Sequence, residues 1–330
     1  MNNKRPVVLV TAPIHEDGVM MLRKEGVEVR VHDQSRPYSK EELIRELQDV
    51  DGVIAGGEDF DEEVIEASKR LKVISRHGVG YDNVNVDAAS RAGVLVTITP
   101  FALSESVAET AIGLMLSVAR KLTNADRLVR EKMWTESYAG ASKFMGVELA
   151  RKRLGIVGLG RIGAHVAKRA LAFDMEVTYH DVIRNELLEQ LMKIEFVAFD
   201  DLLAKSDFVS IHAPLTQATK GLIGEKELKK MKRTSFLINT SRGQLVDQKA
   251  LVRALKEKWI AGAALDVFEV EPIVPSDPIL GLDNAVLTPH IGSATMEARN
   301  RMSREAASNV LTVLRGQQPR NTVNAKTKPR

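Results

Sequence analysis

Cysteine is absent from this sequence of 330 residues, and long apolar runs are absent as well. Without a thiol, disulfide bonds, iron–sulfur clusters and cysteine nucleophiles are excluded, and a cytoplasmic location is the natural expectation. Apolar stretches such as "AIGLMLSVA" fall short of the roughly 18 residues that a membrane span requires. The first apolar run ends before His15, so it predicts a β-strand rather than a secretory signal. We therefore expect no membrane partner.

A strong excess of one charge is also missing. The formal net charge is +3, from 47 basic and 44 acidic residues, and the basic residues are scattered apart from a terminal "KTKPR". This balance gives no sign of a nucleic-acid partner. Hydrophobic residues make up 44% and charged residues 28%, which is typical of globular proteins, and the length predicts two domains.

Short β-branched runs alternate with helical periodicity along most of the chain. This rhythm predicts an α/β protein with two doubly wound parallel-sheet domains. The expected strands are 7–12, 27–33, 52–57, 71–75 and 94–99 in a first series, then 154–158, 176–181, 207–213, 235–240, 262–267 and 284–289 in a second. A helical pattern over 294–316 has no sheet of its own, so it must pack on an existing domain.

The stretch "SESVAETAIGLMLSVARKL" separates the two series. Ser106 precedes Glu109 by three residues, which predicts a capping box at the start of a helix. Apolar or small residues surround this helix almost completely, so we expect it to be buried on more than one side, at a domain junction or a subunit interface.

Glycines in the G-x-G-x-x-G spacing follow the strand at 154–158. They are Gly158, Gly160 and Gly163, and the next strand ends at Asp181, close to the roughly 20 residues expected in a dinucleotide-binding unit. Such glycines let the backbone approach a pyrophosphate at a helix N-terminus, where amide donors favour negative charge. A glycine-rich turn that only packs a helix on a strand is the simpler alternative.

Asp181 also bears on the choice of cofactor. A carboxylate at this strand end accepts hydrogen bonds from both ribose hydroxyls of NAD and repels a 2′-phosphate. Arg184 is the one nearby feature that favours NADP, but one arginine beside a carboxylate is a poor phosphate site. We therefore predict NAD as the cofactor.

Three candidate catalytic residues follow strands of the second series. Arg242 follows "FLINTS", Glu271 follows "GAALDVFEV" and His290 follows "NAVLTP". In an open α/β sheet, ligands bind outside the carboxyl ends of the strands. Hydride transfer to a carbonyl carbon needs a proton donor for the oxygen, a histidine suits that role, and a carboxylate would stabilise its imidazolium. A packed histidine, a solvated glutamate and a surface arginine are the alternatives, and no group of residues has the spacing of a metal site.

The order of motifs resembles that of the D-isomer-specific 2-hydroxyacid dehydrogenases. The resemblance covers nearly the whole chain and rests on "LKVISRHGVGYDNVNVDAASRAG", "GIVGLGRIG", "HAPLT", "INTSRGQLVD", "AGAALDVFEVEP" and "LTPHIGSAT". It implies Arg242 as substrate anchor, Glu271 as partner of the histidine and His290 as acid–base. It also implies that Asp266 contacts the nicotinamide carboxamide and that the amides of Val79 and Gly80 hold the substrate carboxylate.

Further residues complete the predicted sites. We assign Arg76 to substrate binding, and to cofactor binding, beside the three glycines, Asp181 and Asp266, the following: Arg161, Ile162, His212, Pro214 and Thr240. The resemblance implies a discontinuous, flavodoxin-like substrate domain of residues 1–103 and 293–330, and a Rossmann NAD-binding domain of residues 104–292. It further implies a homodimer formed through the helix at 106–120 and the arm after it.

The substrate is the least constrained of these predictions. Glyoxylate, hydroxypyruvate and 3-phosphoglycerate all suit the resemblance, and Arg76 stands where phosphoglycerate dehydrogenases of the family also carry an arginine. A different class of function is an NADH-responsive corepressor of the same fold, which binds peptide motifs through its first domain. The lack of long disordered tails argues against that alternative.

Overall fold

Two separate parallel β-sheets organise the chain. The computed structural model describes residues 5–33, 36–134 and 144–330. Unit 1 comprises Met1–Leu103 and Ala294–Arg330, and unit 2 comprises Ser104–Ser293. All pairings between named strands are parallel in the described residues. The predicted α/β fold class with two parallel-sheet domains is confirmed.

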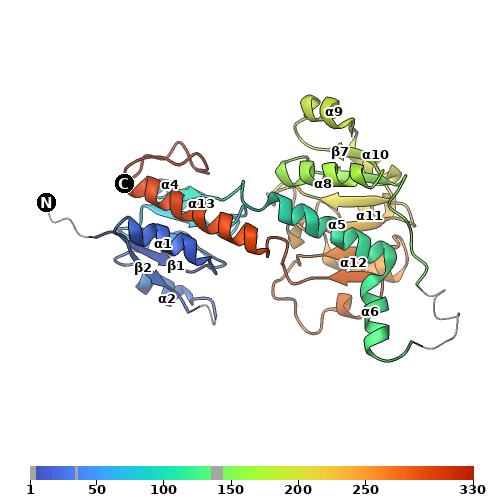
Figure 1. Cartoon of the computed structure of the whole chain (residues 1–330), viewed down its shortest axis with the longest axis horizontal. Helices are drawn as coiled ribbons and strands as arrows, with labels where there is room; N and C mark the ends of the chain where they lie inside the picture. The colour runs from blue at the N-terminus through green and yellow to red at the C-terminus, as the bar shows by residue number, and fades with distance from the viewer. Residues whose placement is uncertain (1–4, 34–35, 135–143) are drawn as a thin grey trace. The chain divides into compact units, whose positions relative to one another are not determined.

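Unit 1 has five strands in the order β2-β1-β3-β4-β5, the order of flavodoxin-like folds. Its elements are β1 (Val7–Val10), α1 (Glu16–Lys24), β2 (Glu28–Val31), α2 (Lys40–Glu46), β3 (Gly52–Ala55), α3 (Glu62–Ala67), β4 (Val73–Arg76), α4 (Val86–Arg91), β5 (Leu95–Thr97) and α13 (Met296–Leu314). One face of the sheet packs on α1 and α13, which lie side by side in Figure 1, and the other on α2, α3 and α4.

Unit 2 has seven strands in the order β12-β11-β10-β9-β6-β7-β8, so that β6 and β9 meet where the strand order reverses. Its strands are β6 (Arg153–Val157), β7 (Glu176–His180), β8 (Glu195–Phe196), β9 (Phe208–Ile211), β10 (Phe236–Asn239), β11 (Gly262–Leu265) and β12 (Ala285–Leu287). Its helices are α5 (Ser104–Arg120), α6 (Leu122–Arg130), α8 (Arg161–Ala172), α9 (Glu186–Met192), α10 (Phe199–Lys205), α11 (Glu225–Lys230) and α12 (Gln248–Lys256), with short 3-10 turns at Gly243–Leu245 and Pro278–Gly281.

Alternation along the central strands of unit 2 sends neighbouring side chains to opposite faces. In β10, Phe236 and Ile238 pack with α5 and α8, whereas Leu237 packs with α10, α11 and α12. Helix α5 lies against α8 and against strands β10, β11 and β12 of its own unit. The apolar character of α5 is therefore accounted for within unit 2.

The predicted capping box at Ser106 is wrong. Helix α5 begins at Ser104, so Ser106 lies inside the helix, where it is buried. Glu109 instead forms an ion pair with Arg169 of α8, at 2.8 Å. Residues three apart share one face of any continuous helix, so the spacing of the motif alone does not fix where the helix starts.

Helix α6 contrasts with α5 because none of its residues is buried. Leu122 and Val129 are about half exposed, and Met133 and Trp134 after the helix are exposed as well. Residues 135–143 of the predicted dimerisation arm lie outside the described residues. None of the helices in the described part of the chain has the length and apolar character needed to cross a membrane.

Candidate functional site

The glycine loop after β6 is shaped by close contacts at two of its three glycines. Gly158 has a φ of 94°, and a Cβ there would lie 2.8 Å from the backbone of His212 and Ala213 after β9. A Cβ on Gly163 would lie 2.2 Å from the carbonyl oxygen of Gly158. Both positions therefore require glycine for the loop to turn and for α8 to approach β6.

Gly160 differs because nothing in the described structure explains its lack of a side chain. It is the N-cap of α8, its φ of −71° is open to any residue, and a Cβ there would meet no atom within 4 Å. Arg161 and Ile162 lie in the first turn of α8, and no side chain of the described residues caps this helix, so its N-terminus can face a ligand. The space and the donors fit a pyrophosphate at the start of α8.

Asp181 lies directly after β7 and faces this loop. Its Oδ2 accepts a hydrogen bond of 2.7 Å from the Leu159 amide. With Ile183, Arg184 and Glu186 it borders an open hollow of about 490 Å³. This places a carboxylate beside the glycine loop, as the ribose of a dinucleotide requires.

The loops after β9 and β10 form the next part of this sheet edge. His212 is hydrogen-bonded through Nε2 to the Ser210 hydroxyl at 2.8 Å, and burial lowers the pKa of His212 to about 4, which keeps the ring neutral. Pro214 is exposed two residues further on. The Thr240 hydroxyl is buried and has no hydrogen-bond partner in the described structure. A buried hydroxyl without a partner is costly, so a ligand that reaches it would be stabilised.

His290 and Glu271 form a close pair beyond β12 and β11. His290 Nδ1 lies 2.7 Å from Glu271 Oε2, and Glu271 Oε1 accepts the Phe268 amide at 2.9 Å. An ionised carboxylate only accepts, so Nδ1 carries the proton and Nε2 is the nitrogen left for another partner. The imidazole is half exposed. Burial raises the pKa of Glu271, but the hydrogen bonds from His290 and Phe268 outweigh it and the pKa lies below its usual value.

Asp266, at the end of β11, holds the turn that carries His290. Its carboxylate is buried and accepts hydrogen bonds from the Thr288 hydroxyl at 2.6 Å, the Ile291 amide at 2.9 Å and the Gly292 amide at 2.7 Å. Its carbonyl oxygen also accepts the His290 amide at 2.8 Å. His290 has a left-handed φ of 54°, which costs of order 1 kcal/mol and persists only because such bonds hold it.

Arg242 follows β10, the strand beside β11. Its positive charge contributes to the low pKa of Glu271, so the two side chains interact electrostatically. The Asn239 amide group donates to the Arg242 carbonyl at 2.8 Å. A Cβ on the next residue, Gly243, would lie 1.8 Å from the carbonyl carbon of Phe268, so the arginine loop rests on the loop that leads to Glu271.

Three supporting residues were absent from the sequence predictions: Asn239, Gly243 and Thr288. A glycine directly after a candidate arginine was the only available signal for the Gly243 contact. Neither Asn239 nor Thr288 belongs to a spacing pattern, because their partners are set by the packing of adjacent loops. The structure brings all predicted unit 2 residues to the carboxyl ends of β6, β7 and β9 to β12, at one edge of the sheet.

The remaining predicted residues lie in unit 1, at the carboxyl end of β4. Arg76 donates from Nε to the Gly80 carbonyl at 3.0 Å and from Nη1 to the Ala55 carbonyl at 3.1 Å. In the described structure the amides of Val79 and Gly80 have no hydrogen-bond partner. Two free adjacent amides are suited to bind an anion such as a carboxylate.

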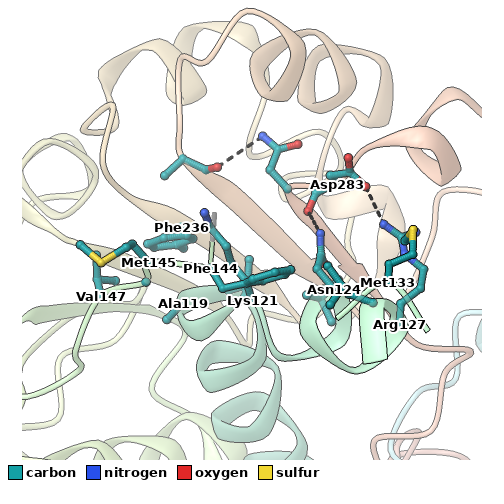
Figure 2. Close-up of a pocket in the computed structure, with 16 residues that line it drawn as sticks. Ala119, Lys121, Asn124, Arg127, Met133, Phe144, Met145, Val147, Phe236 and Asp283 are labelled. Carbon is teal, nitrogen blue, oxygen red and sulfur yellow. Dashed lines mark hydrogen bonds and ion pairs between the residues drawn. The ribbon is translucent and has the colours of Figure 1, made fainter. Parts of the chain in front are cut away.

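A second cavity, of about 590 Å³, lies at the opposite edge of the unit 2 sheet. Phe236 at the start of β10 and Asp283 just before β12 border it, together with residues of α6 and the segment after residue 143. Figure 2 shows Asn124 and Arg127 of α6 reaching Asp283, which binds both at 2.9 Å. This cavity is remote from the strand ends that carry His290 and Glu271. No cluster of potential metal ligands occurs in the described ranges.

Comparisons with known proteins point to one family. Residues 112–292 match the family described as D-isomer specific 2-hydroxyacid dehydrogenase, NAD binding domain. A glyoxylate reductase of Thermofilum pendens is 48% identical over 323 residues, which is 97% of this chain and 95% of the relative.

Two solved structures with bound cofactor are also similar. An NADPH-dependent glyoxylate/hydroxypyruvate reductase of Sinorhizobium meliloti, in complex with NADP and malonate, has a TM-score of 0.86 and 31% identity and covers 99% of both chains. D-lactate dehydrogenase of Aquifex aeolicus, with NAD and lactic acid, has a TM-score of 0.82 and 30% identity, and the match covers 96% of this chain and 98% of that one.

Proposed function

Because the chain belongs to the D-isomer-specific 2-hydroxyacid dehydrogenase family of NAD(P)-dependent oxidoreductases, we propose that it reduces small 2-keto acids in the cytoplasm. Glyoxylate and hydroxypyruvate are the proposed substrates, and the reverse reaction oxidises the 2-hydroxy acid. The observation that carries this proposal is the 2.7 Å pair of His290 and Glu271 on the same sheet edge as the glycine loop. NAD would supply or accept the hydride when bound.

His290 is the proposed proton donor in reduction and the base in oxidation. Glu271 fixes Nδ1 as the protonated nitrogen, which leaves Nε2 to exchange a proton with the substrate oxygen. The lowered pKa of Glu271 keeps its carboxylate charged well into acidic solution, so it stabilises the imidazolium wherever the enzyme works. Asp266 then acts through the turn it holds, in addition to its predicted contact with the nicotinamide carboxamide.

For substrate binding we propose Arg242 in unit 2 as a carboxylate anchor and, considered separately, the adjacent amides of Val79 and Gly80 in unit 1 as an anion-binding group. A guanidinium forms strong, charge-assisted hydrogen bonds with a carboxylate. For the cofactor we propose pyrophosphate binding at Gly160 and the first turn of α8, and ribose binding at Asp181. The remaining proposed cofactor contacts are His212, Pro214 and Thr240, beside Gly158, Gly163, Arg161 and Ile162.

The environment of Arg76 favours unphosphorylated substrates. Its guanidinium is committed to the carbonyls of Ala55 and Gly80, so it shapes the loop of Val79 and Gly80. A guanidinium has five N–H donors, and because at least two of them are used in these bonds, Arg76 has fewer left for a substrate phosphate. 3-Phosphoglycerate is therefore the less favoured of the three candidate substrates.

Steady-state turnover of a panel of 2-keto acids with NADH tests the proposal. We expect kcat/KM for glyoxylate or hydroxypyruvate to exceed that for 3-phosphohydroxypyruvate, the oxidised form of 3-phosphoglycerate. A preference for the phosphorylated acid would contradict the interpretation of Arg76 but not the reaction class. If none of the acids is turned over, the proposal that the protein is an enzyme is contradicted, and the corepressor alternative remains.

We further propose a homodimer in which α6 and the residues around it meet a second copy. Helix α6 has no buried residue, and the apolar side chains Leu122, Val129, Met133, Trp134 and Met145 are each at least half exposed. Such a surface is rarely left open to water. Sedimentation is expected to show a dimer for the wild type and a monomer for Val129→Glu. Met20→Glu, on the exposed face of α1, is the matched control and should remain dimeric.

A further inference from the structure

Arg184 is held by a neighbouring carboxylate at the rim of the hollow beside Asp181. It donates from Nε to Glu189 Oε1 at 2.9 Å and from Nη2 to Glu189 Oε2 at 2.8 Å. The two parallel bonds match the planar guanidinium to the planar carboxylate, which is the strongest arrangement that this pair of side chains forms.

Glu189 is itself fixed by buried structure. The Tyr179 hydroxyl donates to its Oε1 at 2.7 Å, and the Asn185 amide donates to that hydroxyl at 2.8 Å. The Glu189 side chain is only 13% exposed, and the bonds from Arg184 and Tyr179 lower its pKa to about 2. The carboxylate is thus charged at any working pH and is oriented toward Arg184 before a ligand arrives.

We propose that Glu189 sets the coenzyme preference by withholding Arg184 from an adenosine 2′-phosphate. The proposal rests on the binding of NAD at this strand end and goes beyond the repulsion expected from Asp181. Arg184 is the only basic residue among those that border the hollow in the described structure. While Glu189 neutralises it, the hollow presents Asp181 and Glu186 to a phosphate with no available counter-charge.

The arrangement gives the residue pair a specific energetic role. To bind a 2′-phosphate, Arg184 must exchange two good bonds to Glu189 for bonds to the ligand, so the net gain is small. Removing the carboxylate frees the guanidinium at the same place. Two changes are then required to accept NADPH, the loss of Asp181 and the loss of Glu189, and either carboxylate alone sustains the preference for NADH.

Binding of adenosine fragments isolates this effect from catalysis. Titration calorimetry with ADP-ribose and 2′-phospho-ADP-ribose is carried out on Asp181→Ser, on its combinations with Glu189→Gln and with Arg184→Ala, and on the triple variant. Glutamine keeps an acceptor for the Tyr179 hydroxyl but loses the charge. We expect Glu189→Gln to tighten 2′-phospho-ADP-ribose on the order of tenfold, with ADP-ribose unchanged, and Arg184→Ala to abolish that gain.

Glu186→Gln in the same Asp181→Ser background is the matched control, because it removes one charge from the same helix and hollow without touching the pair. Its gain should be smaller and should survive Arg184→Ala. The proposal is overturned if Glu189→Gln does not increase the affinity for 2′-phospho-ADP-ribose, or if the increase persists after Arg184→Ala. If Glu189→Gln does not fold, the comparison of Asp181→Ser with Asp181→Ser/Arg184→Ala decides. An affinity for 2′-phospho-ADP-ribose that changes little when Arg184 is removed supports the proposal. A tenfold loss of that affinity while Glu189 is present contradicts it.

Discussion

The two sheets reverse their strand order in the same way, but the crevices at the reversal are filled differently. In unit 2 the loop between β6 and α8 leaves open space above Gly160. In unit 1 the equivalent place, between β1 and β3, is occupied by Glu58. Its buried carboxylate accepts the Thr11 hydroxyl at 2.6 Å, and that hydroxyl accepts the Gly56 amide at 3.0 Å.

This difference fits the separate roles that we propose for two sheets of the same winding. Open space and uncapped amides at the reversal of unit 2 attract an anion, whereas a buried carboxylate repels one. Unit 1 instead offers its free amides one strand further along, after β4, where Val79 and Gly80 lie. Ligand binding at a sheet edge is therefore decided by the side chains placed there and not by the fold.

The largest difference in kcat is expected between two variants, each of which replaces a histidine that follows a strand, one in each unit. His290→Gln should lower kcat by about a hundred- to ten-thousandfold, because it removes the proposed general acid, and should leave NADH binding nearly intact. His32, directly after β2 in unit 1, is hydrogen-bonded to the Arg36 carbonyl and stacks on Tyr38. His32→Gln should keep wild-type kcat. Steady-state kinetics and NADH titration measure both, and a His290→Gln enzyme of normal kcat would refute the assignment.

A methyl group added where the strand order reverses should affect NADH binding in unit 2 and the free energy of unfolding in unit 1. Gly160→Ala places a Cβ in open space, so we expect NADH to bind about tenfold more weakly while the free energy of unfolding changes little. Gly56→Ala places a Cβ 3.1 Å from the Thr11 carbonyl oxygen and 3.2 Å from Glu58 Oε2. It should cost about 1 kcal/mol of stability without a comparable loss of NADH affinity. Fluorescence titration and chemical denaturation test the pair, and equal behaviour of the two variants would remove the distinction.

A third comparison concerns stability in acid, because each unit contains one histidine whose pKa is lowered. Burial lowers the pKa of His77 in unit 1, with a further contribution from the Arg299 charge, and burial lowers that of His212 in unit 2; both reach about 4 from an ordinary 6.5. Between these values the unfolded chain binds protons that the folded protein does not. The free energy of unfolding should therefore fall as the pH decreases from about 6.5 to about 4.

Replacing either histidine tests that slope. His77→Gln or His212→Gln should flatten the pH dependence of unfolding, each in the transition of its own unit where the two are resolved. Denaturation curves at several pH values between 4 and 7 provide the measurement. A variant that keeps the wild-type slope would show that its histidine is not a source of the acid sensitivity.

Much of the candidate site in unit 2 could be predicted from the sequence because its signals are local. Gly158, Gly160 and Gly163 follow a strand at fixed spacing, and Asp181 ends the next strand. Arg242, Glu271 and His290 each follow an apolar run, and parallel strands bring such positions to one edge without further information. The same local logic failed at Ser106, where the spacing of a capping box occurred inside a continuous buried helix.

The sequence by itself therefore determined the two sheets, the glycine loop and the strand ends that carry the candidate catalytic residues, since periodicity and turn chemistry act over a few residues. Only the tertiary structure decided which partners these residues have. Arg184 pairs with Glu189, and the Asp266 carboxylate accepts hydrogen bonds from the turn that carries His290. Glu58 fills the place between β1 and β3 where the strand order of unit 1 reverses. Each of these contacts depends on side-chain direction and on the close packing of neighbouring loops, for which a pattern of residue types contains no rule.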